Sequence, residues 1–197
     1  MLGSPNRDRI SERREATRLE ILDAAWAVAR ETGLAQLTLR QVADRVGMRA
    51  PSLYSHFDSK NAIYDAMFGQ AWTDCLVLFE SMWDEFPSDG RQALRLAART
   101  FFDFSIQDLA RHQLMNLRII PGFEPSAEAY APAVAVLDLT HRLFLQHGLS
   151  AQEDVDLYVA VVGGLIDSQH ANDPGGQRWS GLVDRAVDML ADNFDLP

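Results

Sequence analysis

The sequence predicts an all-α protein in which a small three-helix N-terminal module precedes a larger helical domain. Apolar residues recur at helical spacing from end to end, and no segment alternates apolar and polar residues as a half-buried strand does. Two glycines, Gly33 and Gly47, divide the first 60 residues into short helices. The charge also changes along the chain. Ten Lys and Arg against eight Asp and Glu give residues 1–60 a charge of +2, whereas eight against twenty give residues 61–197 a charge of −12.

This charge asymmetry indicates a basic module on an acidic body, although surface charge also drifts by chance, so the motifs must decide between the two readings. The 197 residues are enough for one or two domains with a proper core. The longest uncharged apolar run, Leu157–Ile166, has ten residues, whereas a membrane span needs about 20, so we expect no transmembrane helix. The polar N-terminus does not resemble a secretory signal. The single cysteine, Cys75, excludes an intramolecular disulfide, and we expect a cytoplasmic protein.

The N-terminal module begins with a predicted helix from about Ser11 to Thr32, which Gly33 ends. In the next segment, LTLRQVADRVG, Thr38 and Gln41 have the spacing of a capping box. Leu39, Val42, Ala43 and Val46 then follow the helical i, i+3, i+4, i+7 pattern. The sequence therefore predicts a short second helix that Gly47 ends.

A third helix is predicted from Pro51 to about Phe57, because proline is tolerated in a first turn and restricts the residue before it. Leu53 and Phe57 lie four residues apart and are expected to pack inward. The polar side chains between them are left to face solvent. Two short helices joined by a tight glycine turn predict a helix-turn-helix, whose second helix enters the major groove of DNA.

The remaining sequence predicts a helical body. A cap at Asp58 or Ser59 is expected to start a long helix that reaches about Phe86. Pro132 must kink the helix in which it lies or mark the start of that helix. The other expected helices are 89–107, 108–119, 127–147, 151–171 and 177–194, with no strong breaker between the first two.

The stretch TLRQVADRVGMRAPSLYSHFDSKNAIYDAMF, residues 38–68, resembles the TetR family of bacterial helix-turn-helix transcriptional regulators. The resemblance covers the N-terminal module. It implies that residues 1–60 form a DNA-binding domain and that residues 61–197 form a helical regulatory and dimerisation domain. It also implies an operator-binding homodimer, most simply a repressor that a small-molecule effector releases from a palindromic operator.

The resemblance assigns DNA contacts position by position. Family phosphate contacts match Thr38, Ser52, Tyr54, His56 and Lys60, and positions facing base edges match Arg40, Ala50, Pro51 and Ser55. Arginine can bond guanine bidentately, so Arg40 is the best base reader on chemistry alone. The chain departs from the family at Arg49, where serine or threonine is common, so its partner (base or phosphate) stays open. Ser55 replaces a frequent aromatic residue.

The penultimate predicted helix, LYVAVVGGLI, is apolar on all faces, which predicts burial against a partner subunit. A kink or an intrachain contact is the alternative explanation of its two glycines. The expected interface residues are Val159, Val162, Gly163, Gly164, Ile166, Leu182, Val183, Ala186, Val187 and Leu190. Asp184 and Asp188, four residues apart on the last helix, are interpreted as a solvated face.

Aromatic and soft residues of the middle helices are candidates to line a pocket for an unknown effector, although each of them also suits a plain core. They are Trp72, Cys75, Phe79, Trp83, Phe101, Phe104, Met115, Phe123, Tyr130, Phe144 and Tyr158. The acidic body favours an apolar or amphipathic effector that is cationic or neutral. His112, His141, His147 and His170 lack the spacing of metal ligands, and we expect no metal or cofactor.

Two other classes of protein remain as alternatives. An enzyme is disfavoured because the sequence has no nucleophile elbow, phosphate loop, zinc-protease motif or cysteine cluster. A helical protein-interaction or ligand-binding module with a non-functional helix-turn-helix is disfavoured because Arg40, Tyr54, His56 and Lys60 are all intact.

Overall fold

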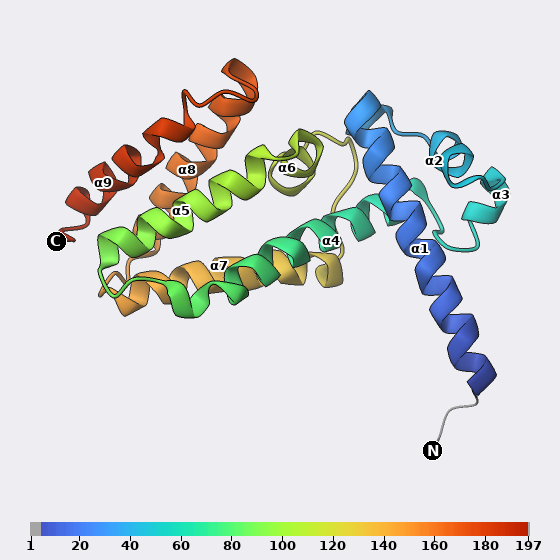
Figure 1. Cartoon of the computed structure of the whole chain (residues 1–197), viewed down its shortest axis with the longest axis horizontal. Helices are drawn as coiled ribbons and strands as arrows, with labels where there is room; N and C mark the ends of the chain where they lie inside the picture. Colours follow the sequence, from blue (N-terminus) through green and yellow to red (C-terminus); the bar gives the residue numbers. More distant parts are fainter. Residues whose placement is uncertain (1–4, 197) are drawn as a thin grey trace.

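The computed structural model describes residues 5–196, and these residues form helices, turns and loops without a strand, so the all-α prediction is confirmed (Figure 1). The α-helices are α1 (Pro5–Thr32), α2 (Leu39–Val46), α3 (Ala50–Leu53), α4 (Lys60–Ser81), α5 (Gly90–Ile106), α6 (Leu109–Asn116), α7 (Ala127–Gln146), α8 (Gln152–Asn172) and α9 (Val183–Asn193). Short 3-10 turns are η1 (Leu34–Gln36), η2 (Trp83–Glu85) and η3 (Ser180–Leu182).

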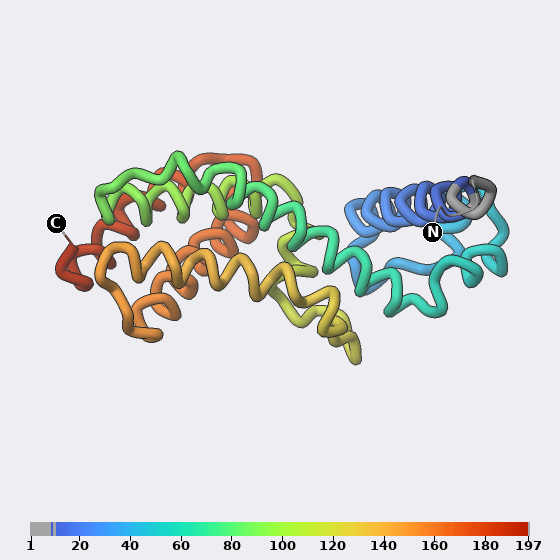
Figure 2. Tube along the Cα trace, turned by 90° about the horizontal axis from the view of Figure 1, so that it is seen from below, coloured from blue at the N-terminus to red at the C-terminus, as the bar shows by residue number. Residues whose placement is uncertain are grey.

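The molecule is elongated, with α1, α2 and α3 at one end and α5, α8 and α9 at the other (Figures 1 and 2). Helix α4 runs from the first group into the second, where it lies along α7. The boundary expected between residues 60 and 61 therefore falls in the first turn of α4. Residues 1–4 and 197 lie outside the described residues. The first four belong to the expected DNA-binding domain and its polar N-terminus, and the last belongs to the expected regulatory domain.

Helix α2 has the predicted start and end. Gln41 donates its backbone N–H to Thr38 Oγ1 (3.3 Å), and the Gln41 side chain accepts from the Thr38 backbone N–H (2.9 Å), which completes a capping box. Gly47 ends the helix with φ +77°, in the left-handed region that favours glycine. Val42 and Ala43 are fully buried, as the periodicity predicts.

Helix α3 is shorter than predicted and ends at Leu53 rather than near Phe57. The chain tightens there into i, i+3 bonds, from Ser55 N–H to Ser52 O (3.2 Å) and from His56 N–H to Leu53 O (2.9 Å). The Ser55 hydroxyl also donates to Ser52 O (2.7 Å) and so competes for a helical acceptor. Leu53 and Phe57 are nevertheless buried, as predicted.

Two other helix boundaries differ from the prediction. Helix α1 begins at Pro5 instead of about Ser11, because proline is tolerated in a first turn and the ERREA segment consists of good helix formers. Helix α4 ends at Ser81 and not at Phe86. Pro87 follows Phe86 and biases it toward the extended conformation that it adopts (φ −63°, ψ 130°).

Helix α7 continues through Pro132. Ser126 caps its start by accepting from Ala129 N–H (3.1 Å), so the alternative that Pro132 marks the start is wrong. Proline at this position removes one ladder bond early in the helix, which the remaining turns tolerate. Asp108 supplies the break between α5 and α6 that the sequence did not reveal, because its carboxylate accepts from Arg111 N–H (3.1 Å) as an N-cap.

Helix α9 begins at Val183, later than the predicted start at residue 177. The buried Gln169 side chain holds the preceding loop in a non-helical path. Its Oε1 accepts from the backbone N–H groups of Trp179 (3.0 Å) and Ser180 (3.3 Å), and its Nε2 donates to Gly176 O (3.2 Å). Backbone groups that would join a helix are satisfied by one side chain instead.

Charged side chains pair α9 with α5, so the interpretation of Asp184 and Asp188 as a merely solvated face is wrong. Arg99 Nε donates to Asp184 Oδ1 (2.6 Å), and Arg95 donates to Asp188. One turn further, Arg91 pairs with Asp188 and Asp192. Three arginines at i, i+4, i+8 on α5 thus face three aspartates of the same spacing on α9.

Within residues 5–196 we found no helix that is both long and apolar enough to cross a membrane.

The α5–α9 ion pairs predict an acid-sensitive contribution to stability. The hydrogen bond from Arg99 lowers the pKa of the Asp184 carboxyl below its ordinary value of 3.8. A carboxyl whose pKa is depressed on folding stabilises the protein above its unfolded pKa, and this contribution is lost as the pH falls through the folded pKa. The cycle of Arg99→Ala, Asp184→Asn and the double variant should therefore give a coupling of about 0.2–1 kcal/mol at neutral pH, since both side chains are partly exposed.

Urea unfolding at neutral pH and in steps below pH 3.8 measures this coupling. It should decline through the acidic range. A coupling that stays constant into that range would contradict the assignment of the pair.

Candidate nucleic-acid interface and ligand cavity

The residues predicted to contact DNA lie together on the α2–α3 end of the molecule. Most of their side chains are exposed, whereas His56 and Lys60 are half-buried. Ala50 is also half-buried and packs against the core, so its methyl is only partly available to a base edge. Tyr54 is 53% exposed although it is aromatic, as expected of a side chain that meets a partner. The exposed members are Thr38, Arg40, Arg49, Pro51, Ser52, Tyr54 and Ser55.

Two arginines of α1 support the end of α3 instead of facing outward. Arg14 Nη2 donates to Ser55 O (3.2 Å), and Arg18 Nη1 donates to His56 O. The Arg18 guanidinium also lies over the Phe57 ring, 4.2 Å from its centroid. These contacts fix the carbonyl groups at the end of the short helix, where helical partners are absent.

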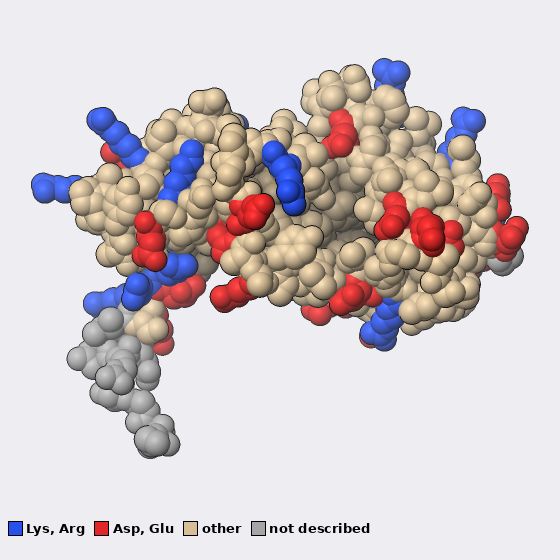
Figure 3. All heavy atoms as spheres, turned by 180° about the vertical axis from the view of Figure 1, so that it is seen from behind, with Lys and Arg blue, Asp and Glu red and all other residues tan. Residues whose placement is uncertain are grey.

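Arg45 of α2 is paired with Glu31 (2.6 Å), whereas the predicted DNA-contacting cations Arg40, Arg49 and Lys60 make no such close ion pair within the described residues. Arg40 is 87% exposed and lies 3.8 Å from Asp44, and Arg49 caps α3 without a side-chain bond. Lys60 begins α4, with its Nζ 5.3 Å from the centroid of Tyr64. In Figure 3 basic side chains project from this end with acidic side chains between them, and side chains of both signs also lie over the rest of the visible face. A lysine beside the free N–H groups of a helix N-terminus suits a phosphate.

Helix α4 is anchored in the N-terminal module by polar contacts. The Tyr64 hydroxyl donates to Leu34 O (2.5 Å), and burial raises the pKa of Tyr64 to about 12. Trp26 Nε1 donates to Gln70 Oε1 (2.9 Å) across α1 and α4. The Tyr64 phenol therefore stays protonated at physiological pH. Helix α4 is held to the N-terminal module at two positions, Tyr64 and Gln70.

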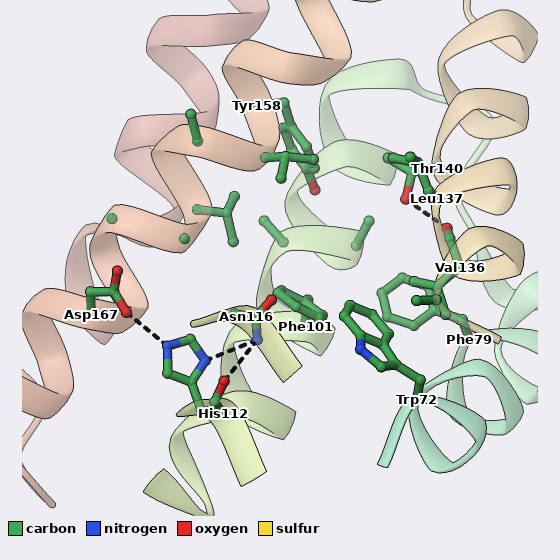
Figure 4. Close-up of a pocket in the computed structure, with 18 of the residues that line it drawn as sticks. Trp72, Phe79, Phe101, His112, Asn116, Val136, Leu137, Thr140, Tyr158 and Asp167 are labelled. Carbon is green, nitrogen blue, oxygen red and sulfur yellow. Dashed lines mark hydrogen bonds and ion pairs between the residues drawn. The ribbon is translucent and has the colours of Figure 1, made fainter. Parts of the chain in front are cut away.

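The body encloses a cavity of about 390 Å³ between α4, α5, α6, α7 and α8 (Figure 4). Its apolar wall includes Trp72 and Phe101, which stack with centroids 6.2 Å apart and an interplanar angle of 19°. Phe79, Val136 and Leu137 continue this wall. The volume lies in the range of small-molecule sites.

Four of the eleven predicted pocket residues line this cavity: Trp72, Phe79, Phe101 and Tyr158. Met115, Phe123 and Tyr130 line a neighbouring, more polar hollow at the α6–α7 connection. The other predicted residues lie elsewhere because aromatic character does not distinguish a cavity wall from a packed core. They are Cys75, Trp83, Phe104 and Phe144.

The positions of these four residues have specific causes. Cys75 is fully buried, and burial raises the pKa of its thiol to about 12, so it is neither a wall residue nor a thiolate. Trp83 packs on Phe86 and under Arg142. Phe104 lies 3.8 Å from the Arg111 guanidinium. Phe144 packs edge-on against Tyr158 and the C-terminal Phe194.

The polar side chains of the cavity were not predicted from the sequence. His112 and Asn116 are four apart on α6, Asp167 follows the apolar run of α8, and Thr140 lies on α7. His112 is 3% exposed, and its ring nitrogen Nε2 lies 2.7 Å from Asp167 Oδ1. An acidic residue directly after a ten-residue apolar run was the signal available in the sequence.

Part of the predicted subunit interface lies inside the chain. Val162 and Ile166 of α8, and Val183, Val187 and Leu190 of α9, are buried within the single chain, which leaves little of their side chains for a partner subunit. The cause is α5, which covers one face of each helix. Val159, Val162, Gly163 and Gly164 line the cavity, whereas Leu182 is exposed and Ala186 is half-buried.

The histidines do not gather around a metal site. Among residues 5–196, no three His, Cys, Asp or Glu side chains lie where they could hold a metal ion together. His112 and His170 stack with centroids 5.1 Å apart, and His170 Nε2 lies 3.1 Å from Ser105 O. His141 contacts Gln152 on the surface.

A helix-turn-helix with an exposed polar face, carried on a helical body, defines a DNA-binding transcriptional regulator. Residues 21–67 match the model of bacterial regulatory proteins of the tetR family. Over 162 residues the chain is 35% identical to the HTH-type transcriptional activator FasR of Mycolicibacterium smegmatis, covering 79% of this chain and 71% of that protein. The chain belongs to the TetR family of transcriptional regulators.

Two further similarities cover most of the chain. Over 174 residues it is 26% identical to the tetracycline repressor protein class A from transposon 1721 of Escherichia coli, covering 84% of this chain and 73% of that protein. The fold is similar to that of the transcriptional regulator FadR from Bacillus subtilis in complex with stearoyl-CoA, with a TM-score of 0.70. That match has 16% identity and covers 87% of this chain and 96% of the other.

The capping box at α2 predicts a measurable contribution of Thr38 to stability, separate from any DNA contact. Thr38→Ala should lower the free energy of unfolding by about 0.5–2 kcal/mol, because it removes the acceptor for Gln41 N–H. Thr38→Ser keeps the hydroxyl and should stay close to wild type. Urea unfolding of the three proteins measures the difference, and equal stability of all three would show that the cap is not made in solution.

Proposed function

We propose that the protein is a sequence-specific, dimeric repressor that a small-molecule effector releases from a pseudo-palindromic operator. The observation that carries the proposal is the course of α4. Its first residue, Lys60, lies at the helix-turn-helix face, and the same helix supplies Trp72 and Phe79 to the cavity wall. A change in the cavity can therefore reach the DNA-binding end along one helix.

The proposed DNA contacts divide into two groups. Thr38, Ser52, Tyr54, His56 and Lys60 would bind phosphate oxygens, which set the position of the module without reading sequence. Arg40, Ala50, Pro51 and Ser55 would face base edges. Arg49 lies at the start of α3, exposed and without a side-chain cap, so its guanidinium can reach either a base or a phosphate. Figure 1 shows α2 and α3 at the outer end of the molecule, away from the body.

Exposed apolar side chains on α8 and α9 support the dimer. Leu157 is 43% exposed, and Leu182 and Met189 are 37% and 66% exposed. Leu182, Ala186 and Met189 follow i, i+4, i+7 on the side of α9 that α5 does not cover. A second copy related by a two-fold axis would cover the exposed stripe of α8 at Leu157 and the exposed stripe of α9. It would also place the two helix-turn-helix modules in successive major grooves.

The cavity supports the effector. Only a ligand with different affinities for two states of the protein can shift their populations. A shift from 1:99 to 99:1 requires about 5.5 kcal/mol of differential affinity. One relative is named a tetracycline repressor and another the activator FasR. Transcription from the operator in vitro therefore tests whether this protein represses or activates. Repression in the absence of effector is the expected result.

The second candidate function is a helical ligand-binding or protein-interaction module whose helix-turn-helix no longer binds DNA. The cavity and the exposed stripes of α8 and α9 favour it as much as they favour a regulator. The exposed polar face of α2 and α3 does not. A mobility-shift assay on palindromic sequences upstream of the protein's own and neighbouring genes distinguishes the two candidate functions. A protein whose helix-turn-helix no longer binds DNA would retard none of these fragments, whereas a regulator would retard its operator.

Replacing the proposed phosphate and base contacts should have different consequences. Lys60→Ala should weaken binding to cognate and random DNA equally and reduce the slope of log K against log salt by about 1. Arg40→Ala should cost about 1–3 kcal/mol on the cognate operator alone. Arg142→Ala, which removes a cation stacked on Trp83 in the body, is the charge-matched control. Fluorescence anisotropy over a salt series measures all three, and an unchanged slope for Lys60→Ala refutes the phosphate contact.

A charge on the exposed stripe of α9 should separate the subunits. Met189→Glu should give monomers at micromolar concentration and weaken operator binding, because a dimer binds two half-sites and a monomer one. Val77→Glu is the control, since Val77 is 58% exposed on α4, away from both stripes. Sedimentation velocity measures the mass. A wild-type protein that sediments as a monomer would contradict the proposed dimer.

A further inference from the structure

The charge and hydrogen-bonding groups of the cavity define the chemical class of its ligand. Asp167 is the acidic side chain of its lining, and among the described lining residues none is lysine or arginine. A bound ligand therefore meets a carboxylate without a neighbouring cationic side chain of the wall. This cavity is the effector site of the proposed function. The chemical class of its ligand follows from the lining alone, and only the regulatory role of that ligand rests on the proposed function.

The His112 ring contacts one oxygen of the Asp167 carboxylate. A carboxylate can only accept, so His112 Nε2–H donates to Asp167 Oδ1 (2.7 Å). Asn116 Nδ2 lies 3.3 Å from His112 Nδ1, which suits a donor facing a lone pair. The second oxygen of Asp167 has no bond to the ring. His170 stacks on His112, and burial lowers the pKa of His170.

The same bonds leave acceptors for the ligand. Asn116 Nδ2 also donates to His112 O (3.2 Å), so the amide hydrogens are used and Oδ1 is left as an acceptor. Asp167 is 52% exposed, and in Figure 4 its second oxygen points away from His112. The Tyr158 hydroxyl donates to Leu94 O (2.8 Å), and that of Thr140 donates to Val136 O (3.1 Å). Neither hydroxyl hydrogen is available to an anionic ligand.

The opposite wall suits a flat apolar body. Trp72 and Phe101 stack there, and Phe79 lies beside them (Figure 4). Trp72 Nε1 is buried and makes no hydrogen bond to the described residues. Aromatic faces also attract cations. Gly163 and Gly164 keep the α8 wall open, because a Cβ at either position would meet nothing within 4 Å.

We propose that the cavity binds a flat, apolar molecule carrying a protonated amine or similar cationic donor, with Asp167 as its counter-ion and Asn116 Oδ1 as a second acceptor. Free carboxylates and acyl-CoA molecules, which are anions, are disfavoured by the same groups. This distinguishes the chain from the FadR protein of similar fold, whose structure contains stearoyl-CoA.

A matched series of probes tests the charge preference directly. Aminomethylanthracene is a cation, hydroxymethylanthracene is neutral and anthracene carboxylate is an anion, and all three share one ring system. Quenching of tryptophan fluorescence in the full-length protein gives the dissociation constants, since Trp72 lies in the wall. The cation should bind at least about tenfold more tightly than the anion, because an ion pair at a partly buried carboxylate is screened less than in water.

Asp167→Asn should remove this preference by weakening the cation alone, with the neutral probe unchanged. Asp156→Asn on α8 is the matched control, because Asp156 is exposed and lies outside the cavity lining. Gly163→Leu should fill the cavity and weaken all three probes, which locates them there. Circular dichroism verifies that each variant keeps the helical content of the wild type.

Three results would overturn the proposal: an anion that binds as tightly as the cation, an Asp167→Asn variant that weakens all probes alike, or a cation that does not bind at millimolar concentration. The outcome is separable from that of the proposed function. A cation that binds with the expected preference but leaves operator affinity unchanged would refute effector release and leave the ligand class standing. Loss of all operator binding in the ligand-free protein would refute the regulator instead.

Discussion

The rest of the structure depends on the continuity of α4, a single helix of 22 residues that packs against α1 in the N-terminal module and against α7 in the body. At its start, the Tyr64 hydroxyl bonds Leu34 O and fixes the helix to the DNA-binding module. Two turns on, Trp72 leaves the module and enters the cavity wall. A hydrogen-bonded helix transmits a displacement along its length better than a loop does, because its bonds resist bending. Any ligand that moves Trp72 therefore acts on the same rigid element that carries Lys60.

Helix α8 presents three faces with different roles. Val155 and Ile166 pack in the core, whereas Val159, Val162, Gly163 and Asp167 line the cavity. The third face is apolar and exposed. A helix that is apolar on all sides thus meets three different environments, which are the core, the cavity and the exposed surface. The Arg–Asp pairs between α5 and α9 hold α9 against the core and leave its other stripe outward.

Local chemistry explains why much of the fold was predictable from the sequence. The Thr38–Gln41 box and Gly47 act within one turn, so α2 is as predicted. Some boundary errors were local, as where the Ser55 hydroxyl takes Ser52 O and shortens α3. Others arose from distant residues, as when Gln169 on α8 satisfies the backbone of residues 179 and 180 and delays α9. Long-range contacts also limit how much of the functional site could be predicted from the sequence. The helix-turn-helix is contiguous in sequence and was located residue by residue, whereas the cavity is assembled from five helices. Its polar end joins His112 to Asp167 across 55 positions, a proximity that periodicity does not contain.

The linkage between cavity and operator through α4 is tested most directly by measuring the probe in the presence of DNA. Thermodynamic reciprocity requires that a ligand which weakens operator binding is itself weakened by the operator, by the same factor. Titration of aminomethylanthracene into the protein, alone and saturated with operator, gives that factor, with a scrambled duplex as control. An operator-induced rise of about fivefold or more in the probe's dissociation constant is expected from typical coupling free energies. An unchanged dissociation constant at saturating operator would show that α4 does not couple the two sites.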